Sequence, residues 1–205
     1  MPEEAREMVY WMTKLVARIL LRILFCWRAS GVENVPRRGR VILCANHISW
    51  WDPVILACSL QRRVYFMAKE ELFSFGPFRW FLRALGAFPV RRGQPDRAAI
   101  RHALQLLQEG KVVGIFPEGT RSRTGVLGRS EPGAALLAVL AKAPVIPVLI
   151  RGPYRFRAPV SVTFGHQFYL QRTTRRSHEL GRLGGEILSR IAELSEESAS
   201  ARATG

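Results

Sequence analysis

Residues 41–52 have the sequence VILCANHISWWD, in which a short apolar run leads directly into Asn46 and His47. An apolar run of that length is typical of a buried β-strand. Asp52 follows His47 after a short polar and aromatic stretch, and Pro53 then suits the first turn of a helix. The segment therefore predicts a strand, a turn and a helix, with a histidine where the strand ends.

The same alternation of short β-rich runs and helical patterns continues along the chain. Candidate strands occupy 41–45, 64–67, 87–90, 112–116, 145–150 and 160–164. Candidate helices occupy 53–60, 77–85, 96–108, 133–140 and, near the C-terminus, 177–194. This rhythm predicts a single α/β domain with a mostly parallel sheet flanked by helices. In such a sheet, chemistry gathers at the strand ends.

The stretch from Val9 to Trp27 is apolar, but a cation interrupts it at every fourth position, at Lys14, Arg18 and Arg22. At this spacing the three cations form one polar stripe of a helix. Charges in the middle of the stretch disfavour a membrane span, so the stripe favours an amphipathic helix lying in the membrane interface. The alternative is an ordinary amphipathic helix packed on the domain.

These patterns divide the chain into three parts. We expect an amphipathic membrane-interface helix over 1–28, the α/β domain over 29–196 and a flexible tail over 197–205.

The composition indicates an anionic partner. Lysine and arginine number 31 against 16 acidic residues, which gives a net charge of +15. Such an excess points to nucleic acid or to a phospholipid surface, and composition does not choose between them. Cys26, Cys44 and Cys58 lie in apolar runs, so we expect reduced core residues and a cytosolic-side environment.

His47 and Asp52 form the first candidate site. A histidine at the end of a strand can deprotonate a hydroxyl if a carboxylate fixes its tautomer and stabilises the imidazolium. Asp52 can be that carboxylate, provided that a turn brings the two side chains together. The alternative is that Asp52 only caps the helix and that His47 is an ordinary turn residue.

A second candidate site is FPEGTR, residues 116–121, which follows the predicted strand 112–116. Its glycine allows close approach of the backbone to an anion, and Thr120 and Arg121 can donate hydrogen bonds to phosphate oxygens. The segment is not a Walker loop, because Thr120 stands where that motif has lysine. The alternative is a Pro-Gly turn with solvated arginines.

Two further segments, GAFPVRR (86–92) and VIPV (145–148), suit plain core packing when considered alone. The interior Pro147 predicts an irregular or edge position in the sheet. The sequence has no nucleophile elbow, no paired-cysteine motif, no metalloprotease helix and no dinucleotide fingerprint, and we expect no metal site.

Taken in order, NHISWWD, GAFPVRR, FPEGTRS and VIPVLIRG resemble the four sequence blocks of the glycerolipid acyltransferase family, over roughly 31–164. The resemblance implies a fold of the glycerol-phosphate acyltransferase type, with His47 as general base and Asp52 orienting it. It also implies that the acceptor phosphate is bound by a set of residues in the second and third blocks: Arg92, Glu118, Gly119, Thr120 and Arg121. Asn46 fits the pattern as a substrate-binding residue.

The implied reaction moves an acyl group from acyl-CoA or acyl carrier protein to the free hydroxyl of lysophosphatidic acid, giving phosphatidic acid without a cofactor. Expected partners are these substrates and an anionic phospholipid surface at the cytoplasmic face of the cell membrane, with no nucleic acid. One departure concerns acceptor choice, because Pro132 stands where relatives often have lysine. The alternatives are another acceptor, such as glycerol-3-phosphate, or a non-enzymatic basic module that binds membranes or nucleic acid.

Overall fold

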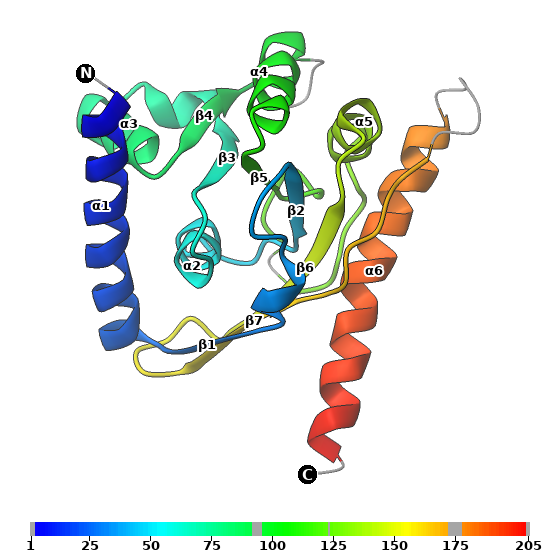
Figure 1. Cartoon of the computed structure of the whole chain (residues 1–205). Helices are drawn as coiled ribbons and strands as arrows, with labels where there is room; N and C mark the ends of the chain where they lie inside the picture. The colour runs from blue at the N-terminus through cyan, green and yellow to red at the C-terminus, as the bar shows by residue number, and fades with distance from the viewer. Residues whose placement is uncertain (1–2, 92–95, 123, 172–177, 204–205) are drawn as a thin grey trace.

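A seven-stranded sheet forms the centre of the molecule, in the order β1-β7-β6-β2-β5-β3-β4 (Figure 1). The computed structural model describes residues 3–91, 96–122, 124–171 and 178–203. Neighbouring strands are parallel except for β6 and β7. The strands are β1 Cys26–Ser30, β2 Val41–Ala45, β3 Val64–Lys69, β4 Ala87–Val90, β5 Val112–Ile115, β6 Val145–Arg151 and β7 Pro159–Phe164. The predicted mostly parallel α/β domain is confirmed.

Helices cover both faces of this sheet (Figure 1). The core on one face includes residues of α1 and α2, and the core on the other includes residues of α4, α5 and α6. A further helix, α3, contacts β4 at the sheet edge. The bounds are α1 Glu3–Leu24, α2 Asp52–Ser59, α3 Gly76–Ala84, α4 Arg97–Gln108, α5 Pro132–Ala141 and α6 His178–Ala203. The last helix therefore extends into the segment that we expected to be a flexible tail.

β2 is the strand on which the two cores meet. Val41, Leu43 and Ala45 belong to the core beneath α1 and α2. Ile42 and Cys44 belong to the core beneath α4, α5 and α6. Because successive side chains of a strand alternate between faces, a strand covered on both sides must be apolar throughout. This explains the unbroken run VILCA.

The start of the sheet differs from the prediction. α1 ends at Leu24, and Cys26–Ser30 forms the edge strand β1, although we expected the helix to continue to Trp27. Cys26 is consequently exposed, and its expected place in the core is wrong. Cys44 and Cys58 are buried, as expected, and burial raises the pKa of their thiols to about 12 and about 11.

Pro147 is not at a sheet edge, because β6 pairs with β2 on one side and with β7 on the other. Between the bridge Val145–Phe168 and the pair Val148–Phe164, two residues of β6 face three residues of the opposite segment. This is a β-bulge, which interrupts the regular ladder and tolerates the missing N–H of proline. The irregular position predicted for Pro147 is confirmed, and the edge alternative is wrong.

α1 packs on the domain through one face that includes Lys14. Tyr10, Ala17 and Leu21 are buried on this face, and Lys14 is buried with them. The Lys14 ammonium donates a hydrogen bond of 2.7 Å to the carbonyl of Leu60, just beyond the end of α2. Burial lowers the pKa of Lys14 to about 8. Lys14 therefore does not belong to an exposed polar stripe.

The rest of α1 exposes an unusually apolar surface. None of the described helices is long and apolar enough to cross a membrane. Large apolar side chains nevertheless face solvent along α1: Met8, Trp11, Met12, Leu15, Val16, Ile19, Leu20 and Ile23. We call this set the α1 apolar face. The helix is thus packed on the domain through one face and exposes large apolar side chains elsewhere.

Candidate active site

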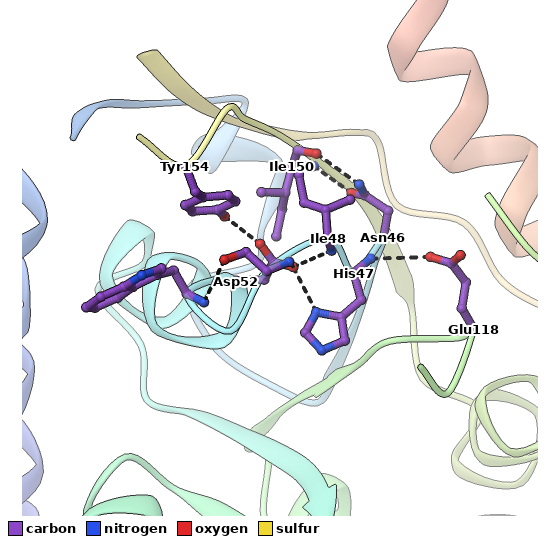
Figure 2. Close-up of polar contacts among 9 residues, drawn as sticks. Asn46, His47, Ile48, Asp52, Glu118, Ile150 and Tyr154 are labelled. Carbon is purple, nitrogen blue, oxygen red and sulfur yellow. Dashed lines mark hydrogen bonds and ion pairs between the residues drawn. The ribbon is translucent and has the colours of Figure 1, made fainter. Parts of the chain in front are cut away.

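His47 and Asp52 meet at the end of β2 where that strand turns into α2. The Nδ1 atom of His47 lies 2.8 Å from Oδ2 of Asp52, and both residues are buried (Figure 2). The same carboxylate oxygen accepts the backbone N–H groups of Ile48, at 2.6 Å, and Ser49, at 2.7 Å. The turn between strand and helix therefore wraps around the Asp52 carboxylate and fixes it beside the imidazole.

The helix-capping alternative is wrong. Trp51 occupies the N-cap position of α2, and no side-chain hydrogen bond caps the helix there. Asp52 belongs to the first turn, but its carboxylate points back to the turn and to His47 rather than to the helix. A carboxylate that holds one nitrogen of an imidazole in this way directs the other nitrogen to act on a substrate.

Tyr154 completes the surroundings of Asp52. Its hydroxyl donates to Oδ1 of Asp52 at 2.5 Å (Figure 2). Burial, followed by the charge of Asp52 and this hydrogen bond, raises the pKa of the Tyr154 phenol, so the hydroxyl remains protonated and donates. Tyr154 was not predicted from the sequence. Its only signal was its position shortly after the fourth block, VIPVLIRG.

The imidazole of His47 is held flat against the ring of Phe116, with the ring centroids 4.1 Å apart and the planes 21° apart. Its Nε2 atom points away from Asp52 (Figure 2), and His47 lines the large cavity described below. In the tautomer that donates from Nδ1 to Asp52, Nε2 carries a lone pair. His47 is therefore placed to accept a proton from a molecule in the cavity.

Asn46 does not contact the cavity. Its amide nitrogen donates to the carbonyl of Ile150 at 2.9 Å, and its amide oxygen accepts the N–H of the same residue at 2.7 Å. The side chain thus continues the pairing of β2 with β6 beyond the last backbone pair. We expected a substrate-binding residue, and instead Asn46 fixes the strand end that carries His47.

The Glu118 carboxylate, expected to belong to the phosphate-binding block, bonds to backbone groups of the site. Its buried carboxylate accepts the N–H of His47 at 3.3 Å and the N–H of Gly128 at 2.9 Å. A carboxylate would also repel a phosphate. Together with the bond from the N–H of Ser122 to the carbonyl of His47, at 2.8 Å, it joins the 116–122 loop to the end of β2.

The other residues of the third block do reach the cavity. Gly119, Thr120 and Arg121 line it together with His47. Gly119 has a φ of 66°, in the left-handed region that favours glycine. The Arg121 guanidinium lies 3.9 Å from the centre of the Trp50 ring, which supports it by a cation–π contact. Arg92 lies outside the described residues.

The cavity has a volume of about 1150 Å³, above the range of about 300–1,000 Å³ of ordinary small-molecule sites. Its walls are mainly apolar and come from α1, α2, α3 and β3, with Val16, Val54, Phe66 and Phe81 among them. Its polar lining near His47 comes from the 116–122 loop. The site thus combines a base, a cation and a large apolar space.

Two other features concern the site: the grouping of possible metal ligands and the start of α5. Within the described ranges, no three His, Cys, Asp or Glu side chains are grouped so that they could hold a metal ion. Pro132 is the first residue of α5, where its fixed φ suits the helix start. It therefore begins the helix at the position where relatives often have lysine.

The fold and this site agree with the comparisons with known proteins. The family model described as Acyltransferase matches residues 26–151, which include His47, Asp52 and the 116–122 loop. The chain belongs to this family.

Several relatives carry one particular name. A 1-acyl-sn-glycerol-3-phosphate acyltransferase of Streptococcus pneumoniae is 31% identical over 193 residues, which cover 87% of this chain and 72% of the relative. A protein of the same name from Bacillus subtilis is 37% identical over 137 residues, 66% of this chain and 68% of the relative. The crystal structure of the 1-acyl-sn-glycerophosphate acyltransferase of Thermotoga maritima superposes with a TM-score of 0.72 at 26% identity, covering 96% of this chain and 83% of that chain.

The geometry of Glu118 predicts a loss of stability rather than of phosphate affinity on substitution. Glu118→Gln replaces one acceptor oxygen by a donor amide facing backbone N–H groups, so we expect the free energy of unfolding to fall by roughly 1–3 kcal/mol. Urea denaturation measures this. Glu109→Gln, at an exposed carboxylate paired with Gln105, is the matched control and should leave stability unchanged. A stable Glu118→Gln protein with weakened phosphate binding would restore the expected ligand role.

Proposed function

We propose that this protein transfers an acyl group from an acyl thioester to the free hydroxyl of 1-acyl-sn-glycerol-3-phosphate, which gives phosphatidic acid. The observation that carries the proposal is the buried His47–Asp52 pair at the wall of a large apolar cavity, with Arg121 beside it. The names of the relatives support the choice of acceptor.

The reaction needs one base and no covalent enzyme intermediate. Nε2 of His47 accepts the proton of the acceptor hydroxyl while the oxygen of that hydroxyl bonds to the thioester carbonyl carbon. Asp52 stabilises the imidazolium that forms. When the tetrahedral intermediate collapses, the carbon–sulfur bond breaks, and the imidazolium returns the proton to the leaving thiolate. The Thr120 hydroxyl and the Arg121 guanidinium are side-chain donors that line the cavity beside His47.

The apolar cavity suits the acyl chains of the substrates, and Arg121 suits the acceptor phosphate. The guanidinium can donate two parallel hydrogen bonds to phosphate oxygens, and its stacking on Trp50 leaves its edge available. The donor is acyl-CoA or acyl carrier protein, and both present the same thioester to His47.

The membrane surface is the natural source of such substrates, and the α1 apolar face supports contact with it. On α3 and just before it, Phe75, Trp80 and Phe81 are also exposed, whereas Phe73 is buried in the core. The side chain of Phe78 lies outside the described set. We propose that these side chains rest in the interface of the cytoplasmic leaflet while the cationic surface attracts anionic headgroups. Free thiols such as Cys44 and Cys58 suit the reducing environment on the cytoplasmic side of the membrane.

The test of the function is transfer activity in a panel of acceptors and donors, with products identified by mass. His47→Ala should lower kcat/KM by roughly 100- to 10,000-fold while the protein stays folded. His166→Ala, at an exposed histidine away from the site, is the control and should behave as wild type. Undiminished turnover in His47→Ala would exclude the mechanism, and a product formed only from glycerol-3-phosphate would change the acceptor.

Arg121 should act on the acceptor rather than on the donor. Arg121→Ala removes a charged donor pair, so we expect KM for lysophosphatidic acid to rise roughly tenfold with little change in KM for the thioester. Arg101→Ala removes the same charge from the exposed side of α4 and should leave both constants unchanged. The opposite pattern, with only the thioester KM raised, would assign Arg121 to the donor.

Ile19, on the α1 apolar face, should contribute to membrane binding without contributing to catalysis. Ile19 is 52% exposed and does not line the cavity, so Ile19→Ser should weaken binding to phosphatidylglycerol vesicles by at least about fivefold. Leu140→Ser, at a residue 55% exposed on α5, is the matched control. Vesicle sedimentation gives the affinities, and activity toward detergent-dispersed substrate should persist. Equal affinities of the two variants would show that α1 does not face the lipid.

A further inference from the structure

Tyr154 contacts the oxygen of Asp52 that His47 leaves unused. Asp52 presents Oδ2 to His47 and to the turn, and presents Oδ1 to the Tyr154 hydroxyl (Figure 2). The two oxygens of this fully buried carboxylate are thus held by different parts of the chain. One is held by the turn after β2, and the other by the loop between β6 and β7.

The surroundings of Tyr154 hold the hydroxyl in place. Its ring packs edge-on against Phe25, with centroids 5.4 Å apart, and Phe25 in turn packs against Trp51 beside Asp52. The same loop is tied to the end of α1, since the N–H of Arg157 donates to the carbonyl of Leu24 at 2.6 Å. The phenol is therefore placed by the packing of its ring and by the backbone contact of its loop with α1.

Tyr154 does not line the cavity, so it cannot contact a substrate there directly. Any effect on the reaction must pass through Asp52. A hydrogen bond to a carboxylate disperses its negative charge and weakens its hold on a proton or on a neighbouring cation. Here that neighbour is the imidazolium that forms on His47 during the reaction.

We propose that Tyr154 is a positioning residue of the active site, which fixes the Asp52 carboxylate and moderates its effect on the basicity of His47. This inference rests on the role of His47 as general base. Tyr154 transfers no proton in the reaction and remains a donor to Oδ1 throughout.

The proposal is tested by Tyr154→Phe, which removes the hydroxyl and keeps the ring against Phe25. With one donor fewer, Asp52 stabilises the imidazolium more strongly, so the acid limb of the pH profile of kcat/KM should move to higher pH by roughly 0.5 unit. On the plateau, kcat should fall about three- to tenfold because the carboxylate is less well fixed. KM for lysophosphatidic acid should stay unchanged.

Tyr10→Phe is the matched control. The Tyr10 hydroxyl is buried and accepts the N–H of Val64 at 3.3 Å, and this partner belongs to β3 rather than to the turn that holds His47 and Asp52. Its loss should affect stability alone. A Tyr154→Phe enzyme that resembles Tyr10→Phe, with a lower melting temperature but the wild-type pH profile and kcat, would show a purely structural role and overturn the proposal.

A second measurement covers the case in which Tyr154→Phe does not fold. Incorporation of 3-fluorotyrosine at position 154 keeps the hydrogen bond but makes the phenol a stronger donor. The acid limb should then move in the opposite direction, to lower pH, and an unmoved limb would overturn the proposal. If His47→Ala is inactive while both Tyr154 replacements match wild type, this inference alone fails and the proposed function stands.

Discussion

The Asp52 carboxylate is a negative charge that is buried away from water. The rest of the site supplies the hydrogen bonds that stabilise this buried charge. Burying an ionised group is unfavourable unless hydrogen bonds replace its hydration. Asp52 receives them from two backbone N–H groups of its own turn, from His47 and from Tyr154. These donors come from the end of β2, from the turn that follows it and from the loop after β6, and Asp52 itself begins α2, so the buried charge requires all these segments to meet.

The parallel sheet makes this meeting possible. β5 and β6 flank β2 on its two sides, and all three strands end at the same edge of the sheet. Two side chains then fix the strand ends to one another. Asn46 joins β2 to β6 through both the N–H and the carbonyl of Ile150, and Glu118 joins the loop after β5 to the N–H of His47. Side-chain hydrogen bonds thus continue the pairing of the strands beyond the sheet and hold His47 in place.

The sequence predicted most of the strands and helices because their signals are local. The unbroken run VILCA and the helix-starting prolines depend on neighbours a few residues away. The prediction from sequence missed β1, because Cys26–Ser30 is short, lies at the sheet edge and has no clear alternation of apolar and polar residues. Lys14 was misplaced for a different reason. Its spacing matched a polar stripe, but only the packed structure supplies the carbonyl of Leu60 that its ammonium binds.

The site residues that could be predicted from the sequence were also those with a local signal. His47, Asp52 and Arg121 were predicted because their side chains suit acid–base chemistry and phosphate binding and because they lie in the sequence blocks that follow predicted strands. Asn46 and Glu118 were expected to bind substrate, yet the Asn46 amide and one oxygen of Glu118 bond to backbone groups far away in the sequence. Tyr154 was not predicted, since its partner is more than a hundred positions distant along the chain.

The cavity shares part of its wall with the outer surface of the molecule. Met12, Val16 and Leu20 line the cavity and also belong to the exposed side of α1. A bilayer resting against this helix would therefore touch the rim of the cavity itself. An acyl chain could then pass sideways from the hydrocarbon of the membrane into the protein, and it would not have to cross water. On this geometry, the enzyme would encounter its lipid by diffusion within a plane rather than through the solution.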